Sequence, residues 1–115
     1  MDRKPAGVFR ALGDPNRIRI MKMLEVRQLC VCEVKEVLAL SNSTVSKHLS
    51  LLHDAGLIKQ TRDGKWVNYA INSTTEDGLV RFVVSLLKAS LTEDKSVRTG
   101  SEKLKNVDRN KICQV

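Results

Sequence analysis

The sequence lacks the features of a membrane or secreted protein. No apolar run approaches the ~18 residues that a membrane-spanning helix needs. The N-terminal stretch MDRKPAGVF carries charges but no apolar segment of the kind found in signal peptides. Cysteine is scarce, and an odd count of 3 argues against a framework of structural disulfides. We therefore expect a cytoplasmic protein whose cysteines serve thiol chemistry or metal binding.

Size and charge indicate what the chain could bind. At 115 residues it is one domain with a modest core, so dimerisation is expected. The formal net charge of +7 at pH 7 and the pI of about 9.6 suit a polyanionic partner such as nucleic acid. Many small domains are basic, so charge alone does not establish nucleic-acid binding.

Helical signals dominate the first half of the chain. A short helix is predicted from Ala6 to Leu12, and a second follows Asp14, which can cap it, with Pro15 at its first position. Two more helices are predicted from Cys30 to Leu40 and from Ser43 to Ala55, with a short polar break between them. This break makes the last two a candidate helix-turn-helix pair.

The predicted helix from Ser43 to Ala55 has two unlike faces. Val45, Leu49 and Leu52 recur at helical spacing and predict the buried face. The other face carries short hydrogen-bonding side chains and one cation, which pack poorly but suit contacts with polar edges. These residues are Ser43, Thr44, Ser46, Lys47 and Ser50.

After this helix the apolar period changes to two, which predicts a β-hairpin. Segments Ile58–Arg62 and Lys65–Ile71 flank Asp63-Gly64, a two-residue turn signal. Helix, break, helix and basic hairpin form the order of a winged helix-turn-helix, whose second helix lies in the major groove of DNA. We therefore expect a mainly α fold with a small β-hairpin wing that binds double-stranded DNA.

The DNA-binding candidates divide into two groups, because base contacts specify sequence whereas phosphate contacts set the register. We assign base contacts to Ser43, Ser46 and Lys47, and contacts with either bases or the DNA backbone to Thr44. Arg62 and Lys65, beside the hairpin turn, are assigned to the DNA backbone. His48 is a further candidate for a phosphate contact.

The last third of the chain combines an apolar helix with a polar tail. Residues 73–76, STTE, predict a capping box that opens a helix from Thr75 to Leu91. That helix is apolar all round and needs a second surface, so we predict that it forms the seam of a homodimer. The residues assigned to this seam are Leu79, Phe82, Val83, Leu86 and Leu87. Residues 1–91 are assigned to one DNA-binding and dimerisation domain, and 92–115 to a polar, flexible tail.

Three stretches together resemble the ArsR/SmtB family of metal-responsive repressors: ALGDPNRIRIMKML, LCVCEV and STVSKHLSLLHDAGLIKQTRDGKWVNYAI. LCVCE is most similar to its arsenic-sensing branch. The resemblance covers roughly Phe9 to Leu91 and implies a homodimeric winged-helix repressor, dimerised through terminal helices, that leaves its operator on binding metal or metalloid. Two-fold pairing predicts an imperfect palindrome with half-sites about one helical turn, ~34 Å, apart.

Cys30 and Cys32 are the candidate metalloid ligands. In a regular helix their side chains would point roughly 200° apart and could not hold one ion. Ligation would have to distort the helix, and the strain would reach the recognition helix. Thiolates select soft or borderline ions, and Thr75–Leu91 lacks the His of the zinc site that the family places on its last helix. We therefore expect As(III) or Sb(III) as inducer, with Glu33 as an exposed partner of the helix dipole.

The third ligand stays open. The arsenic branch often carries a third cysteine one helical turn after the pair, but Lys35 stands at that position. Cys113 could supply a sulfur from the tail of either subunit, or it could be an idle thiol. A small thiol or water could also take this place. Cys30 and Cys32 could themselves be buried as small apolar residues.

The hypothesis that follows is a repressor of arsenic resistance genes, induced by As(III) or Sb(III), with no enzymatic activity. Two alternatives stay open. The same fold could sense another soft metal or thiol oxidation, although Cys30 and Cys32 are too close for an unstrained disulfide in helix geometry. A thiol enzyme such as an arsenate reductase is disfavoured, because no Gly-rich loop or Cys-x5-Arg pattern surrounds any cysteine.

Overall fold

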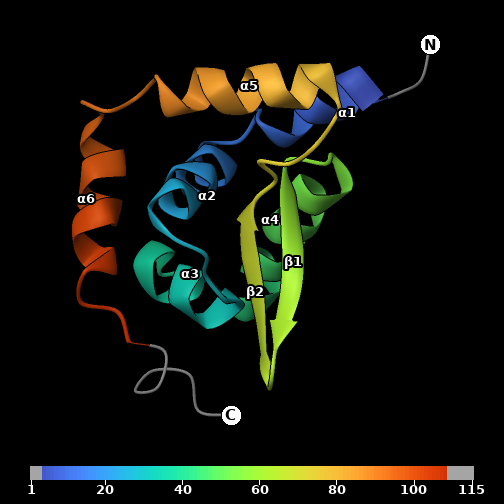
Figure 1. Ribbon diagram of the computed structural model, residues 1–115. Helices are drawn as coiled ribbons and strands as arrows, with labels where there is room; N and C mark the ends of the chain where they lie inside the picture. The colour runs from blue at the N-terminus through green and yellow to red at the C-terminus, as the bar shows by residue number, and fades with distance from the viewer. Residues whose placement is uncertain (1–3, 109–115) are drawn as a thin grey trace.

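The computed structural model describes residues 4–108 of the chain. The elements in this part are α1 (Lys4–Ala11), α2 (Pro15–Val26), α3 (Val31–Leu38), α4 (Asn42–Asp54), β1 (Ile58–Asp63), β2 (Trp66–Ile71), α5 (Gly78–Lys88) and α6 (Lys95–Leu104). Figure 1 shows α5 at the opposite end of the molecule from the tip of the hairpin, with α6 alongside α2 and α3. The predicted fold, mainly α with a hairpin wing, is confirmed.

The core forms where α2, α3, α4 and the start of β1 meet. Val45, Leu49 and Leu52, predicted as the buried face of α4, are fully buried. They pack in one cluster with apolar residues of α2 such as Ile20 and Met21. This packing fixes α4 by its apolar face and leaves its polar face outward. Among the described residues, no helix has the length and apolar character that crossing a membrane requires.

The start of α2 follows the sequence signal. The Asp14 carboxylate accepts hydrogen bonds from the backbone N–H groups of Asn16 at 2.7 Å and Arg17 at 3.3 Å, and Pro15 occupies the first turn. Burial alone would raise the pKa of Asp14, but these hydrogen bonds outweigh it and hold the pKa below its usual value. The cap therefore stays ionised at neutral pH and orients the first turn of α2.

Helix α5 is shorter than the predicted span of Thr75–Leu91. It begins after Asp77, whose side chain accepts hydrogen bonds from two backbone N–H groups of the first turn, so the predicted capping box does not open it. Its C-terminal end is held by the buried Lys22 of α2, whose ammonium donates to the carbonyls of Leu87 at 2.7 Å and Ser90 at 2.8 Å. A buried cation at the negative end of the helix stabilises that end.

The segment predicted to be a flexible polar tail contains helix α6, so this prediction differs from the structure. Asp94 caps α6, and Val97, Gly100 and Leu104 form a narrow stripe at helical spacing. Gly100 and Leu104 are buried, and α6 packs against α2 and α3. Because the stripe is only one residue wide per turn, the charged residues around it concealed it in the sequence. Residues 109–115 lie outside the described part.

The hairpin turn lies one residue later than predicted. Asp63 pairs with Trp66 across the antiparallel strands, so the loop is Gly64-Lys65 rather than Asp63-Gly64. Gly64 has φ +60°, a conformation that glycine adopts without the strain of a side chain. The Lys65 ammonium lies 5.3 Å from the centre of the Trp66 ring, a cation–π contact at the tip of the wing.

Candidate nucleic-acid interface and thiol site

The start of α4 is a capped and exposed helix end. Ser41 caps it: its hydroxyl accepts a hydrogen bond from the Thr44 backbone N–H at 3.2 Å and donates to Thr44 Oγ1 at 2.8 Å. The Ser43 hydroxyl lies 3.3 Å from that of Ser41. The first turn thus presents a connected set of hydroxyl groups at the surface, where a duplex could meet them.

The structure places the predicted DNA-binding side chains on two elements. Those on the outer face of α4 are exposed: Ser43, Thr44, Ser46 and Lys47. His48 is half-buried at the border of this face. Arg62, near the end of β1, and Lys65, in the hairpin turn, are exposed at the tip of the wing. The arrangement provides one polar helix face and one basic loop, as a winged helix requires.

The residues predicted for the dimer seam do not all face outward. Phe82 and Leu86 of α5 are 67% and 55% exposed, but Val83 is 4% exposed and belongs to the protomer's own core. Leu79 and Leu87 are partly buried against that core. Phe9 of α1, which sequence reasoning missed, is 61% exposed. Phe82, Leu86 and Phe9 are therefore the apolar side chains of these two helices that are available for contact with a partner.

The start of α3 overturns the expected geometry of the thiol pair. Cys30 is not in the helix but caps it, with an extended backbone at φ −94° and ψ 170°, and only Cys32 lies in helical conformation. The angular argument assumed regular helix at both positions and is therefore wrong. The two sulfurs lie 3.3 Å apart, with Cys30 buried and Cys32 half-buried. No distortion is needed to bring them to one side.

Glu33 was predicted to be exposed, and it is instead 3% exposed. One carboxylate oxygen accepts a hydrogen bond from the Cys30 backbone N–H at 2.9 Å, and the other lies 2.8 Å from Arg27 Nη1. This is the capping-box contact of an N3 glutamate, with cysteine in place of the usual Ser or Thr. Glu33 thereby holds the backbone of Cys30 from inside the protein.

Burial raises the pKa of the Cys30 thiol, and the neighbouring Glu33 carboxylate adds to the rise by repelling a thiolate. The thiol form of Cys30 therefore prevails at neutral pH. Ligation of a soft ion by this sulfur would release a proton, as thiolate binding requires. Within residues 4–108, no group of three or more His, Cys, Asp or Glu side chains is arranged to hold a metal ion.

Comparison with known proteins places the chain in a family. The family described as bacterial regulatory protein, arsR family, matches residues 14–60. An uncharacterized HTH-type transcriptional regulator of Methanocaldococcus jannaschii is 36% identical over 84 residues, covering 72% of this chain and 94% of the relative. The arsenical resistance operon repressor of Bacillus subtilis is 38% identical over 79 residues, covering 68% and 75%. This chain belongs to the ArsR family.

A solved structure agrees with this ArsR-family assignment. The homodimeric winged helix-turn-helix DNA-binding domain from Mycobacterium bovis has a TM-score of 0.64 and 26% identity, covering 75% of this chain and 76% of that one. The present protein is accordingly a winged-helix transcriptional regulator that binds DNA and is not an enzyme. The match over residues 14–60 spans α2, α3, α4 and the beginning of β1.

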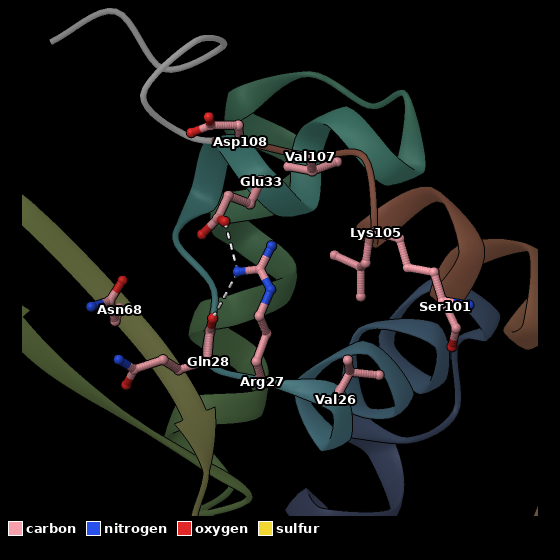
Figure 2. Close-up of a pocket in the computed structure, with 10 residues that line it drawn as sticks. Val26, Arg27, Gln28, Glu33, Asn68, Ser101, Lys105, Val107 and Asp108 are labelled. Carbon is pink, nitrogen blue, oxygen red and sulfur yellow. Dashed lines mark hydrogen bonds and ion pairs between the residues drawn. The ribbon is translucent and has the colours of Figure 1, made fainter.

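An open groove of about 900 Å³ lies beside the thiol helix of this ArsR-family protein. Figure 2 shows Arg27 reaching across it to Glu33, with Asp108 near the same end of α3. The groove thus brings the end of the described chain next to the helix that carries Cys32. Cys113, the predicted third ligand, lies outside the described residues.

Sequence reasoning missed several residues that shape these sites and misjudged the role of Glu33. Ser41 and Glu33 could have been found from capping patterns, since each lies three residues from its partner in the chain. Phe9 and Arg17 have no such local signal. Arg17 contacts His48, which is 31 positions away, and only the folded chain brings these two together.

Proposed function

We propose that this protein is a homodimeric repressor of arsenic resistance genes that leaves its operator when Cys30 and Cys32 bind As(III) or Sb(III). The observation that carries the proposal is the 3.3 Å separation of the two sulfurs at the start of the helix that leads into the DNA-reading helix. The operator is expected to be an imperfect palindrome, because a two-fold dimer presents two identical reading helices.

The sulfur separation favours a pyramidal ligand over a tetrahedral one. With metal–sulfur bonds of about 2.3 Å, sulfurs 3.3 Å apart subtend about 90° at a shared atom, whereas a tetrahedral ion such as Zn²⁺ requires about 109°. As(III) and Sb(III) carry a lone pair that narrows the angles between their three bonds below the tetrahedral value, and they are soft, as thiolate donors require. The two sulfurs therefore suit a trivalent metalloid that takes one further donor.

Cys113 of the same protomer is the third donor that we propose. α6 packs on α2 and α3 of its own chain, and Asp108, which follows it, lines the groove beside Glu33. The 5 residues from Asp108 to Cys113 span up to ~17 Å when extended, and this length supports Cys113 as the donor. The similarity to the arsenical resistance operon repressor of Bacillus subtilis supports an arsenical inducer.

Two short routes connect Cys30 and Cys32 to the DNA-binding elements. Leu29, directly before Cys30, exchanges both backbone hydrogen bonds with Tyr69 of the wing, at 3.0 and 2.7 Å. At its other end, α3 passes through a turn at Ala39 into the cap of α4 and packs against α4. A ligand that moves the Cys30 backbone acts on both elements, and by linkage DNA and ligand then oppose each other's binding.

The dimer seam of the proposal uses the exposed apolar side chains. Phe82 and Leu86 on α5 and Phe9 on α1 are the most exposed of the large apolar side chains in the described part, apart from Val26 of α2. Val83 is excluded from the seam, because it is buried within one protomer. The homodimeric state of the Mycobacterium domain supports this arrangement.

The test is arsenite-induced release of DNA, followed by fluorescence anisotropy under reducing conditions. The probe is a duplex that the wild-type protein enriches from a random-sequence library. We expect arsenite to release the wild-type protein, whereas Cys30→Ser and Cys32→Ser bind the duplex and stay bound. Serine is a suitable replacement at the cap, since its hydroxyl also caps helices. If the wild-type protein stays bound at saturating arsenite, metalloid sensing is wrong although DNA binding stands.

A comparison of wild type with Cys113→Ser tests which group is the third donor to the metalloid. Cys113→Ser should bind the same duplex with unchanged affinity but require much more arsenite for release. An unchanged arsenite response would show that Cys30 and Cys32 suffice and would remove Cys113 from the site. Mixed dimers of Cys113→Ser and Cys32→Ser protomers separate the two sources, because donation within one protomer leaves no complete site in such a dimer.

Thiol oxidation is the second candidate function, and the same 3.3 Å separation favours it. The helix-geometry argument against a bond between the two sulfurs no longer applies, since Cys30 lies outside the helix. Mass spectrometry after mild peroxide treatment, in parallel with the anisotropy assay, distinguishes the candidates. A Cys30–Cys32 disulfide that releases DNA, together with no response to arsenite, would replace the metalloid proposal.

A further inference from the structure

Arg17 of α2 links the end of α1 to the DNA-reading helix. Its Nε donates to the Ala11 carbonyl at 2.7 Å and its Nη2 to the Arg10 carbonyl at 3.3 Å, both at the end of α1. Its Nη1 lies 3.1 Å from Nδ1 of His48 on α4. One planar guanidinium thus takes its orientation from two backbone carbonyls and presents a fixed N–H group to the His48 ring.

This contact determines which nitrogen of His48 carries the proton. A guanidinium has only donors, so Nδ1 must accept, and the proton of the neutral ring is then on Nε2. Nε2 lies on the side of the ring away from Arg17. Among residues 4–108, no hydrogen bond to Nε2 is found, and the ring is half-buried at the edge of the exposed face of α4.

The position of His48 suits a phosphate rather than a base. It follows Lys47 directly and lies one turn beyond Thr44, on the border between the polar face of α4 and the core face. When a reading helix enters the major groove, the middle of its outer face meets base edges and its borders meet the flanking backbone. A neutral N–H group at this border can donate to a phosphate oxygen.

We propose that Arg17 is a positioning residue that holds His48 as a neutral Nε2–H donor to a phosphate of the bound DNA. The proposal rests on the DNA-binding function above and adds two residues with distinct roles. A neutral donor strengthens binding without releasing a counterion. The His48 contact should therefore leave the salt dependence of binding unchanged, unlike a contact made by a cation.

The first test compares three histidine variants on the library-derived duplex. His48→Asn keeps an acceptor for Arg17 but has no donor at the Nε2 position, and we expect about tenfold weaker binding by the dimer. His48→Gln places an amide N–H group near the Nε2 position and should lose less than about threefold. His53→Asn, at an exposed site near the end of the same helix, is the control and should bind as the wild type. Equal losses for Asn and Gln at position 48, or no loss for either, overturn the proposal.

The second test asks whether Arg17 acts through His48. Arg17→Lys keeps the charge but cannot donate to α1 and to His48 at the same time, so binding should weaken severalfold. In the His48→Asn background the same change should add nothing. An equal loss in both backgrounds would assign Arg17 a structural role only. Thermal unfolding of every variant checks that it folds.

The third test measures salt slopes and the tautomer itself. Wild-type and His48→Asn proteins should show the same slope of log K against log salt, whereas Arg62→Gln should reduce it by about 2 per dimer. Nitrogen NMR at pH 8 should show the proton on Nε2 of His48, with the other tautomer rising in Arg17→Lys. A proton on Nδ1 in the wild type overturns the proposal. Failure of the wild type to enrich any duplex would instead overturn the DNA-binding function.

Discussion

The two helices of the helix-turn-helix begin in different ways. α4 begins at the surface, where Ser41 and Thr44 satisfy each other's hydrogen bonds in reach of solvent. α3 begins in the interior, where Cys30 is the cap and the buried carboxylate of Glu33 holds its backbone N–H. The cap of α4 therefore lies where an outside partner can reach it. At α3 the buried cap holds the sulfurs of Cys30 and Cys32 against packed residues, so a change in the bonding of these sulfurs acts on the interior of the protein.

The largest loss of stability is expected from a change at the buried start of α3. Glu33→Ala removes the acceptor for the Cys30 N–H and the partner of Arg27, and we expect the free energy of unfolding to fall by about 2 kcal/mol. The half-exposed Arg27 can turn to water, so the loss is smaller than for a fully buried ion pair. Urea denaturation measures it. Glu33→Gln, which keeps an acceptor, should lose less than half as much. A loss for Glu33→Ala no greater than that of an exposed cap would contradict the comparison.

A smaller loss of stability is expected from a change at the exposed start of α4. Ser41→Ala should lower the free energy of unfolding by about 1 kcal/mol, since one capping acceptor is lost while water can reach the freed N–H. Ser41→Asp retains the cap and should keep wild-type stability but bind DNA more weakly, because its charge would face phosphates. Urea denaturation and anisotropy read the two effects separately. Undiminished DNA binding by Ser41→Asp would place this helix end away from the duplex.

A substitution in the turn at Ala39, between α3 and α4, should raise the stability of the protein rather than lower it. Ala39 has φ 55° and ψ 43°, a left-handed conformation that strains any side chain. Ala39→Gly removes the strain and should raise the free energy of unfolding by about 0.5 kcal/mol after the entropy of the unfolded glycine is included. Ala89 caps α5 with φ −82°, so Ala89→Gly is the matched control and should destabilise. Stabilisation by both changes would show that strain at Ala39 is not the cause.

The smallest effect is the dependence of stability on pH that the buried Cys30 contributes. Because burial raises the pKa of Cys30 above its usual value of 9.0, the folded protein holds the thiol proton more tightly than the unfolded chain does. Its contribution to stability is therefore complete below pH 9 and is lost as the pH rises above that value. The difference in unfolding free energy between wild type and Cys30→Ser should be flat from pH 6 to 8 and shift against the wild type above pH 9. Guanidinium titrations at each pH measure this difference.

Prediction from sequence succeeded where a periodic pattern spans a whole element. The apolar spacing of Val45, Leu49 and Leu52 predicted both the buried face of α4 and its outward polar face. The hairpin was predicted from its change of period, but its turn shifted by one residue, because Asp63 joined the strand pairing with Trp66. Local signals thus locate elements better than they locate their ends.

Prediction failed where one residue decides the geometry. Cys30 is not a usual capping residue, so the spacing from Cys30 to Glu33 was not recognised as a capping box, and both cysteines were placed in regular helix. The single-file stripe of α6 did not stand out from its charged surroundings. The pairing of Arg17 with His48 depends on the packing of α2 against α4, which no local pattern encodes.

The central claim is that a metalloid binds the two sulfurs at the start of α3, and arsenic K-edge X-ray absorption tests it most directly. In the reduced wild-type protein loaded with one equivalent of arsenite, we predict a first shell of sulfur atoms around arsenic. The double variant Cys30→Ser, Cys32→Ser should leave arsenic in the oxygen shell of free arsenite. An oxygen shell in the wild type, or a sulfur shell that persists in the double variant, would contradict the account.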